Sequence, residues 1–166
     1  MKKSLSLLVV TALGLALGGC GFQPLYGEGE RGLAESALLD MQVAPQTTRT
    51  GQLVRNALLS GIAPAASRGG HTLLDFTATE SEKTSISFFS SGDSRRRLIL
   101  DVAYVLKDRD SGKTLHSGKT FSEVPYTVTD QPVADMQARI HARETAARVV
   151  ARDMRNRLAA WFAARG

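Results

Sequence analysis

Three consecutive arginines, Arg95, Arg96 and Arg97, form the clearest candidate for a binding site in the sequence. A guanidinium group donates two parallel hydrogen bonds to a phosphate or carboxylate, so this run favours a multivalent anion as its ligand. The closest acids along the chain are Asp93 and Asp101. A solvated strand end, whose charges oppose edge-to-edge pairing, would have the same sequence. Both interpretations stay open.

Lys119 is a second candidate, in the predicted partner strand of the same hairpin. If the hairpin loop covers 108–112, Lys119 lies opposite Asp101 and Arg97 lies opposite Glu123. Each pair would then be a cross-strand salt bridge that contributes well under about 1 kcal/mol. These cations therefore have a structural interpretation beside the binding one.

Side chains suited to catalysis or metal binding are scattered along the chain. His71, His116 and His141 fall on different predicted elements, where we expect surface positions. The sequence has no G-x-S-x-G, H-E-x-x-H, G-x-x-x-x-G-K-[ST] or paired-cysteine motif. We therefore predict a protein that is not an enzyme, with no catalytic residue, no bound metal and no cofactor.

Cys20 is the single cysteine, so it has no disulfide partner and no second thiolate ligand for zinc. Lys2 and Lys3 precede an uncharged apolar run, 5–17, that is shorter than the ~20 residues needed to span a bilayer. This pattern is typical of a secretory signal peptide, and we predict that residues 1–19 are cleaved. The alternative is a buried N-terminal core helix.

The sequence Leu17-Gly18-Gly19-Cys20 resembles the lipobox of bacterial lipoproteins. The resemblance implies an S-diacylglycerol on the Cys20 thiol and an N-acyl group on its new amino terminus. Each buried CH₂ contributes about 0.8 kcal/mol, so three chains form a durable membrane anchor. Gly21, in place of Asp, implies sorting to the outer membrane. The Gly-rich, charged residues 20–36 are then predicted to be a lipidated tether.

The elements that would position these residues follow from hydrophobic periodicity. Alternating apolar residues predict strands over 71–81, 97–107 and 113–123, and a short apolar run predicts a first strand over 38–43. Residues 52–62 fit a helix, and 80–94 fit a long loop or a bending strand continuation. The predicted fold is α+β, a two-layer sandwich of a four-stranded, mostly antiparallel sheet with two helices on one face (β-α-β-β-β-α). It forms one domain over 37–166.

The second helix is predicted over 133–164, where no Gly or Pro occurs. Its predicted apolar stripe consists of Val133, Met136, Ile140, Ala147, Ala151, Met154, Leu158 and Phe162. Arg148, Arg152 and Arg155 flank this stripe, and we expect solvated cations whose aliphatic stems cover the core edge. The signal peptide argues against nucleic acid as their ligand, because it removes the protein from the cytoplasm.

The ordered combination of these features resembles the LptE family of lipopolysaccharide-assembly lipoproteins. The resemblance is carried by the Cys20-Gly21-Phe22 start, the Gly-Gln-Leu-x-Arg-Asn-x-Leu pattern over 51–58, the strand led by Arg97, and the Ala/Arg-rich helix that ends in Trp161-Phe162.

This resemblance implies an outer-membrane lipoprotein on the periplasmic side. It would complex with the LptD β-barrel as plug and assembly partner, and bind lipopolysaccharide. The family's basic sheet residues map onto Arg97 and Lys119, with Arg95 and Arg96 as neighbours, and Phe22 and Tyr26 become candidate contacts to the barrel. The alternatives are a lipid-anchored periplasm-facing enzyme and a generic envelope-binding lipoprotein.

Overall fold

Residues 37–62, 70–85, 94–129 and 131–165 are described by a computed structural model, and all belong to one compact unit. The predicted signal peptide, the tether with Cys20, Phe22 and Tyr26, and residues 86–93 of the predicted loop lie outside these residues.

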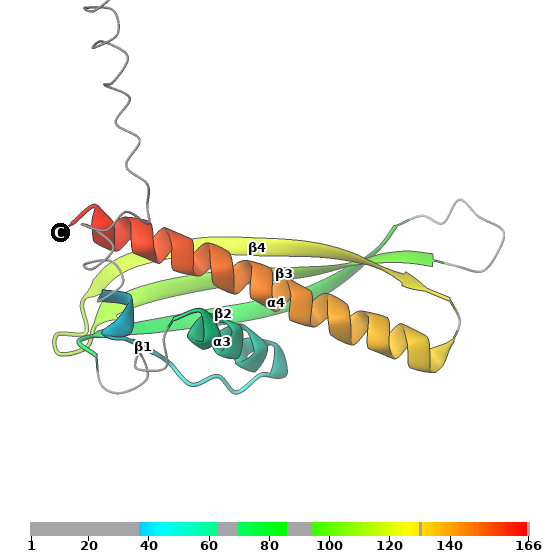
Figure 1. Ribbon diagram of the computed structural model, residues 1–166, viewed down its shortest axis with the longest axis horizontal. Helices are drawn as coiled ribbons and strands as arrows, with labels where there is room; N and C mark the ends of the chain where they lie inside the picture. The colour runs from blue at the N-terminus through cyan, green and yellow to red at the C-terminus, as the bar shows by residue number, and fades with distance from the viewer. Residues whose placement is uncertain (1–36, 63–69, 86–93, 130, 166) are drawn as a thin grey trace, which may run out of the picture. The chain divides into compact units, whose positions relative to one another are not determined.

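Four strands form a single sheet in the order β1-β2-β3-β4. β1 (Met41–Val43) runs parallel to β2 (Thr72–Ser85), while β3 (Ser94–Asp108) and β4 (Thr114–Val128) are added antiparallel. The helices α3 (Arg49–Gly61) and α4 (Pro132–Ala163) cover the same face of this sheet (Figure 1). The predicted α+β fold is therefore confirmed.

The core lies between the helices and the sheet because side chains alternate between the two faces of each strand. In β3 the even-numbered residues from 98 to 106 point towards the helices and are buried. The Ala-rich side of α4 lets its backbone pack closely on this layer. The core members contributed by β3 and α4 include Leu98, Leu100, Val102, Tyr104, Leu106, Ala146, Ala147, Val150, Ala151, Met154 and Leu158.

Helix α3 begins where a threonine caps it. The Thr48 side-chain oxygen accepts a hydrogen bond from the Gly51 backbone N–H over 3.0 Å, which satisfies one of the free donors of the first turn. The first strand is shorter than the predicted 38–43, because residues 37–39 form a helical turn instead. β2 continues to Ser85, so the first part of the predicted loop 80–94 is strand.

The start of α4 is exposed, which contradicts the predicted apolar stripe. Val133 and Met136 are 71% and 54% exposed, and the buried residues of α4 begin at Ala142. Towards this end the axis of α4 diverges from the strands, so the first turns of the helix lie away from the sheet (Figure 1). Near this end the Asp135 carboxylate accepts hydrogen bonds from the backbone N–H and the hydroxyl of Thr129.

The predicted register of the β3–β4 hairpin is wrong by two residues. Lys119 lies opposite Ala103 rather than Asp101. Lys107 pairs with Thr114 instead of the predicted Lys113, which moves the register by one residue, and a bulge between Leu106 and Lys107 moves it by one more. A shift of two residues keeps every side chain on its predicted face, since strand side chains alternate with period two. Only the cross-strand partners change.

A half-buried ion pair fastens α4 to the edge of the core. The Arg143 guanidinium donates two hydrogen bonds to the Glu80 carboxylate, of 2.6 and 2.7 Å, and the Thr50 hydroxyl donates a third from α3 over 2.8 Å. Both charged side chains are less than a quarter exposed. Mainly the Arg143 hydrogen bonds hold the pKa of Glu80 below its usual value, against the opposing effect of burial.

We expect Glu80→Gln to lower the free energy of unfolding at pH 7 by about 2 kcal/mol, because Arg143 loses its charged partner. A lowered folded-state pKa stabilises the fold above the carboxyl's unfolded pKa of roughly 4.5, and this contribution disappears as the pH falls through the folded value. Urea unfolding between pH 3 and pH 7 should show the two proteins converging at the acidic end. Glu144→Gln, on the exposed side of α4, is the control. A constant difference at every pH would contradict the assignment.

Candidate functional site: the open face of the sheet

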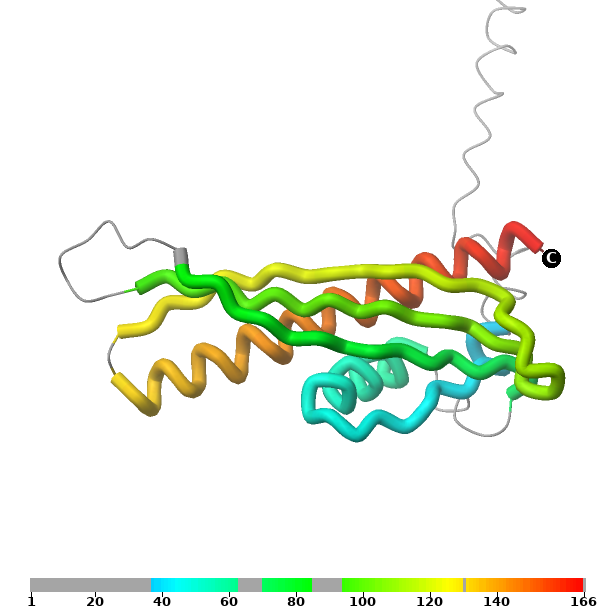
Figure 2. The backbone as a smooth tube through the Cα atoms, turned by 180° about the vertical axis from the view of Figure 1, so that it is seen from behind, coloured from blue at the N-terminus to red at the C-terminus, as the bar shows by residue number. Residues whose placement is uncertain are grey.

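One face of the sheet carries no helix, and we call it the open face. Figure 2, seen from behind, shows β2, β3 and β4 in front of both helices. The side chains that point to this face are the odd-numbered residues of β2 and β3 and, beyond the hairpin bulge, of β4. Among them are five basic residues, Lys83, Arg95, Arg97, Lys107 and Lys119, and three acidic ones, Asp75, Asp101 and Glu123.

The strand pleat divides the arginine run between the two faces. Arg96 points to the helix side, where its guanidinium lies 4.0 Å from the carboxylate of Glu82. The same carboxylate forms an ion pair of 2.5 Å with Arg139 of α4. Arg96 therefore belongs to the contact between sheet and helix, so the run does not act as a single patch.

Arg95 and Arg97 point to the open face and are exposed. Arg97 lies opposite Pro125, yet its guanidinium still reaches the Glu123 carboxylate over 2.9 Å. Both side chains are more than a third exposed, so this pair contributes little to stability and a ligand can compete for Arg97. Arg95 forms no ion pair with any described residue.

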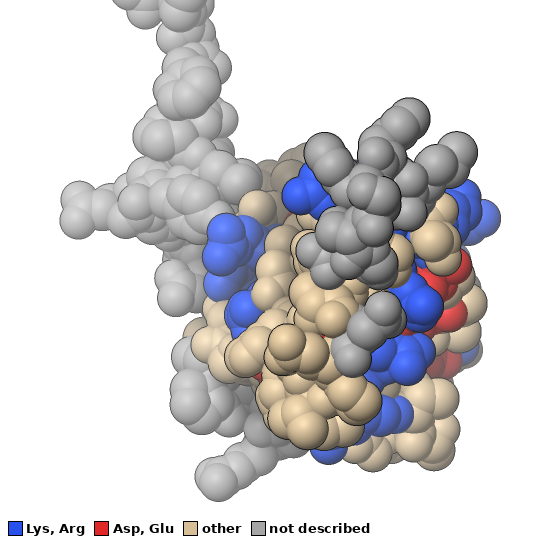
Figure 3. Space-filling model, turned by 90° about the vertical axis from the view of Figure 1, so that its right-hand side faces the viewer, with Lys and Arg blue, Asp and Glu red and all other residues tan. Residues whose placement is uncertain are grey.

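Lys83 is a basic residue of this group that the sequence did not reveal. It lies directly opposite Arg97 on the neighbouring strand, and Arg95 follows one pleat further along. Like charges opposite each other destabilise a sheet, so the pairing of Lys83 with Arg97 on one face favours a binding role over a stabilising one. A view of this end of the domain shows Lys and Arg side chains on both of its sides, and Asp and Glu mainly on one (Figure 3). We call Lys83, Arg95 and Arg97 the basic end.

Lys119 does not join the basic end. Its partner Ala103 is six residues from Arg97 along β3, which separates the two positions by about 20 Å. Lys119 lines a shallow groove of about 340 Å³ together with Thr77, Thr79 and Asp101. It forms no ion pair with any described residue, so the predicted bridge to Asp101 is absent there.

Apolar and acidic side chains lie between Lys119 and the basic end, where Phe121 pairs with Asp101 and Ile99 pairs with Glu123. Phe121 is 64% exposed on β4, and Ile99 is buried on the same face without belonging to the core beneath the helices. An exposed aromatic ring between two cationic positions makes this an amphipathic surface. It suits an elongated ligand that carries anionic groups and apolar chains.

The histidines lie apart from the open-face cations. His71 approaches Asp40 at 3.0 Å, and this hydrogen bond raises the pKa of the imidazole. His116 stacks on Trp161 with ring centroids 5.4 Å apart, and His141 lies 3.8 Å from Glu144. The described residues hold no group of three or more His, Cys, Asp or Glu that could bind a metal ion.

A family model described as LptE, lipopolysaccharide-assembly, matches residues 38–158. The chain belongs to this family. The resemblance noted in the sequence is thus confirmed, and with it a general role in lipopolysaccharide assembly. The LptE family is a family of lipoproteins rather than of enzymes. No curated protein matches the chain.

Solved structures agree with the LptE assignment. A Caulobacter crescentus protein classed as a lipoprotein is 25% identical, with a TM-score of 0.66 over 80% of this chain and 97% of its own. A minor lipoprotein from Acinetobacter baumannii is 12% identical, with a TM-score of 0.52 over 72% of this chain and 90% of its own, and it supports the fold alone. In the part of the chain that the structure describes, no helix is long and apolar enough to cross a bilayer.

Proposed function

We propose that this LptE-family protein is anchored through acylated Cys20 to the periplasmic side of the outer membrane. There it complexes with the LptD β-barrel as plug and assembly partner, and binds lipopolysaccharide during its insertion into the outer leaflet. Family membership and the lipobox-like sequence support this proposal.

The observation that carries the binding role is the composition of the open face. Lipopolysaccharide bears phosphates and carboxylates beside its acyl chains, and guanidinium groups bind both kinds of anion. The basic end and Lys119 supply two cationic positions about 20 Å apart, with exposed Phe121 between them. We therefore place the anionic groups of the ligand at these two positions. Arg96 is not part of the proposed site, because its side chain faces Glu82 on the helix side of the sheet.

Charge reversal of Lys83 and Arg95 tests this assignment. Neither side chain pairs with a described acid, so Lys83→Glu/Arg95→Glu removes ligand contacts without breaking an ion pair. We expect lipopolysaccharide affinity to fall at least about tenfold, equivalent to roughly 1.4 kcal/mol, and a similar fall for Lys119→Glu. Surface-immobilised lipopolysaccharide and the full chain in non-ionic detergent provide the measurement.

The matched control is Arg109→Glu/Lys113→Glu, which makes the same change in charge at the exposed β3–β4 turn. This control should retain affinity within about twofold. Equal losses in all three variants would show that net charge alone attracts lipopolysaccharide, and would contradict a site on the open face.

The partner is tested by isolating the acylated protein from outer membranes. We expect a large β-barrel protein to co-purify, and Cys20→Ala to release the chain from the membrane fraction. Phe22→Ser/Tyr26→Ser should weaken the complex if these residues contact the barrel. Recovery of the wild-type protein as a partner-free monomer would contradict the LptD assignment and leave an envelope-binding lipoprotein.

A further inference from the structure

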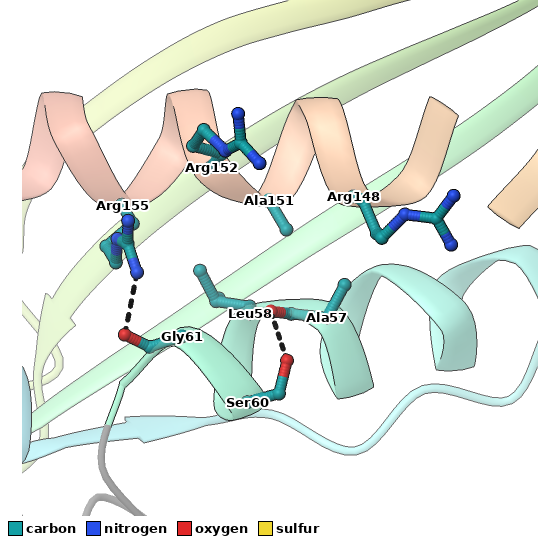
Figure 4. Close-up of a pocket in the computed structure, with 8 residues that line it drawn as sticks. All are labelled: Ala57, Leu58, Ser60, Gly61, Arg148, Ala151, Arg152 and Arg155. Atoms are coloured by element: carbon teal, nitrogen blue, oxygen red, sulfur yellow. Dashed lines mark hydrogen bonds between the residues drawn. The ribbon is translucent and has the colours of Figure 1, made fainter. Parts of the chain in front are cut away.

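A hollow lined by three arginines lies between the two helices, in the helical layer rather than on the open face. It has a volume of about 220 Å³. Arg148, Arg152 and Arg155 of α4 line one side of it, and the C-terminal turns of α3 line the other (Figure 4). Three small residues, Ala57, Gly61 and Ala151, leave the space that the arginines border.

Arg155 is held in place by α3. Its guanidinium donates a hydrogen bond of 2.8 Å to the backbone carbonyl of Gly61, at the helix terminus where carbonyl groups lack intrahelical partners. A Cβ atom on Gly61 would lie 2.7 Å from the same guanidinium, so glycine leaves room for this contact. The sequence predicted only a solvated cation here. The structure instead gives Arg155 a fixed position at the mouth of the hollow.

The charge of the hollow is not compensated by the described residues. Arg148 donates a hydrogen bond to the Thr145 hydroxyl, and Arg152 makes no hydrogen bond or ion pair with any described residue. No carboxylate lines the hollow, and α3 contains no acidic residue at all. Arg148 and Arg152 are also one helical turn apart, where like charges destabilise a helix. Three cations thus line the hollow without an acid, although in Figure 4 only Arg155 points towards α3, and this uncompensated positive charge favours an anion.

We propose that this hollow, bounded by Arg148, Arg152, Arg155 and the end of α3, binds a phosphate monoester or diphosphate group. The volume accommodates one such group, Arg155 already points towards α3, and the exposed side chains of Arg148 and Arg152 would turn towards a bound anion. The site is independent of the open face, because it lies on the other side of the sheet. It stands whether or not the open face binds lipopolysaccharide.

Calorimetric titration of the full chain in non-ionic detergent with inorganic pyrophosphate, at low ionic strength, tests the proposal. We expect saturable binding that Arg148→Gln/Arg152→Gln weakens at least tenfold. Both side chains are exposed, so this variant should fold normally. The control Arg109→Gln/Lys113→Gln removes the same charge at the β3–β4 turn and should change affinity less than twofold.

A second variant alters the space and leaves the charge unchanged. Ala57→Leu places a larger side chain in the hollow while every arginine remains, and it should also weaken pyrophosphate binding at least tenfold. Thermal melting confirms that each variant is folded. Absence of saturable binding to the wild type, or equal weakening by the pocket and control variants, would overturn the proposal.

The source of the phosphate is distinguished by vesicles. Neutral phosphatidylcholine vesicles that contain phosphatidic acid present a lipid phosphate monoester, whereas those containing phosphatidylglycerol present a diester at equal density. Arginine-dependent binding to phosphatidic acid alone assigns the site to a lipid headgroup. Arginine-dependent binding of free pyrophosphate without preference between the vesicles assigns it to a soluble phosphate. Binding to both vesicles that Arg148→Gln/Arg152→Gln leaves unchanged, with no pyrophosphate binding, would overturn a phosphate site.

Discussion

Gly70→Ala should lower the free energy of unfolding by about 4 kcal/mol or more, among the largest effects of any single methyl group in this protein. A Cβ atom at position 70 would lie 1.5 Å from the backbone carbonyl oxygen of Asp40, so the two segments cannot keep their places. Gly70 precedes β2 and Asp40 precedes β1, and the His71 N–H donates to the Asp40 carboxylate across the same contact. The substitution therefore separates the parallel pair of strands. Urea unfolding monitored by circular dichroism measures the loss.

Gly112→Ala is the matched control for this prediction. Gly112 has a φ of +68° in the β3–β4 turn, and a Cβ there would meet nothing within 4 Å. Its cost is limited to the strain of a left-handed residue, about 1 kcal/mol. Similar losses of stability at the two glycines would mean that backbone strain, and not the contact with Asp40, causes the loss at Gly70. That result would contradict the packing of Gly70 on Asp40.

Leu100→Ala should lower the free energy of unfolding by about 2–5 kcal/mol, the range for a buried leucine whose removal leaves a cavity. Leu100 is fully buried on the helix side of β3, in the same core cluster as Val150 and Met154 of α4. The neighbouring residue Ile99 points to the open face and lies outside this cluster. Ile99→Ala should therefore cost less, about 2 kcal/mol or below. Chemical denaturation of both variants makes the comparison.

The difference between these neighbours tests which face of β3 holds the core. An equal or larger loss for Ile99→Ala would mean that the open face is covered by protein in the isolated chain. The proposal that this face meets a ligand would then fail.

Much of the fold could be predicted from local sequence pattern. Period-two alternation in β3 placed the even-numbered residues from 98 to 106 on one face, which is the buried one. The Ala-rich, Gly-free segment predicted a long helix. These patterns succeed because the backbone geometry of a strand or a helix fixes which side chains share a face, whatever the element packs against. They failed at the start of α4, where Val133 and Met136 fit the stripe but are exposed, because the helix diverges from the sheet there.

The candidate sites depended on contacts that no local pattern contains. The cross-strand pairing depends on the length of the β3–β4 turn and on the bulge beside Lys107, so the partners of Lys119 and Arg97 were misassigned while their faces were correct. The β2–β3 register places Lys83 opposite Arg97, so Lys83 belongs to the basic end. Arg96 does not belong to it, because its side chain faces Glu82.

The sequence by itself thus determined the family resemblance, the element types and the face on which each strand residue lies, because these properties depend on residues close together in the chain. Tertiary structure alone decided that Arg97 and Lys119 are about 20 Å apart, and that Arg155 reaches Gly61 across the helix pair. Those distances depend on strand register and helix packing. Register and packing are fixed by side chains that meet from distant parts of the chain.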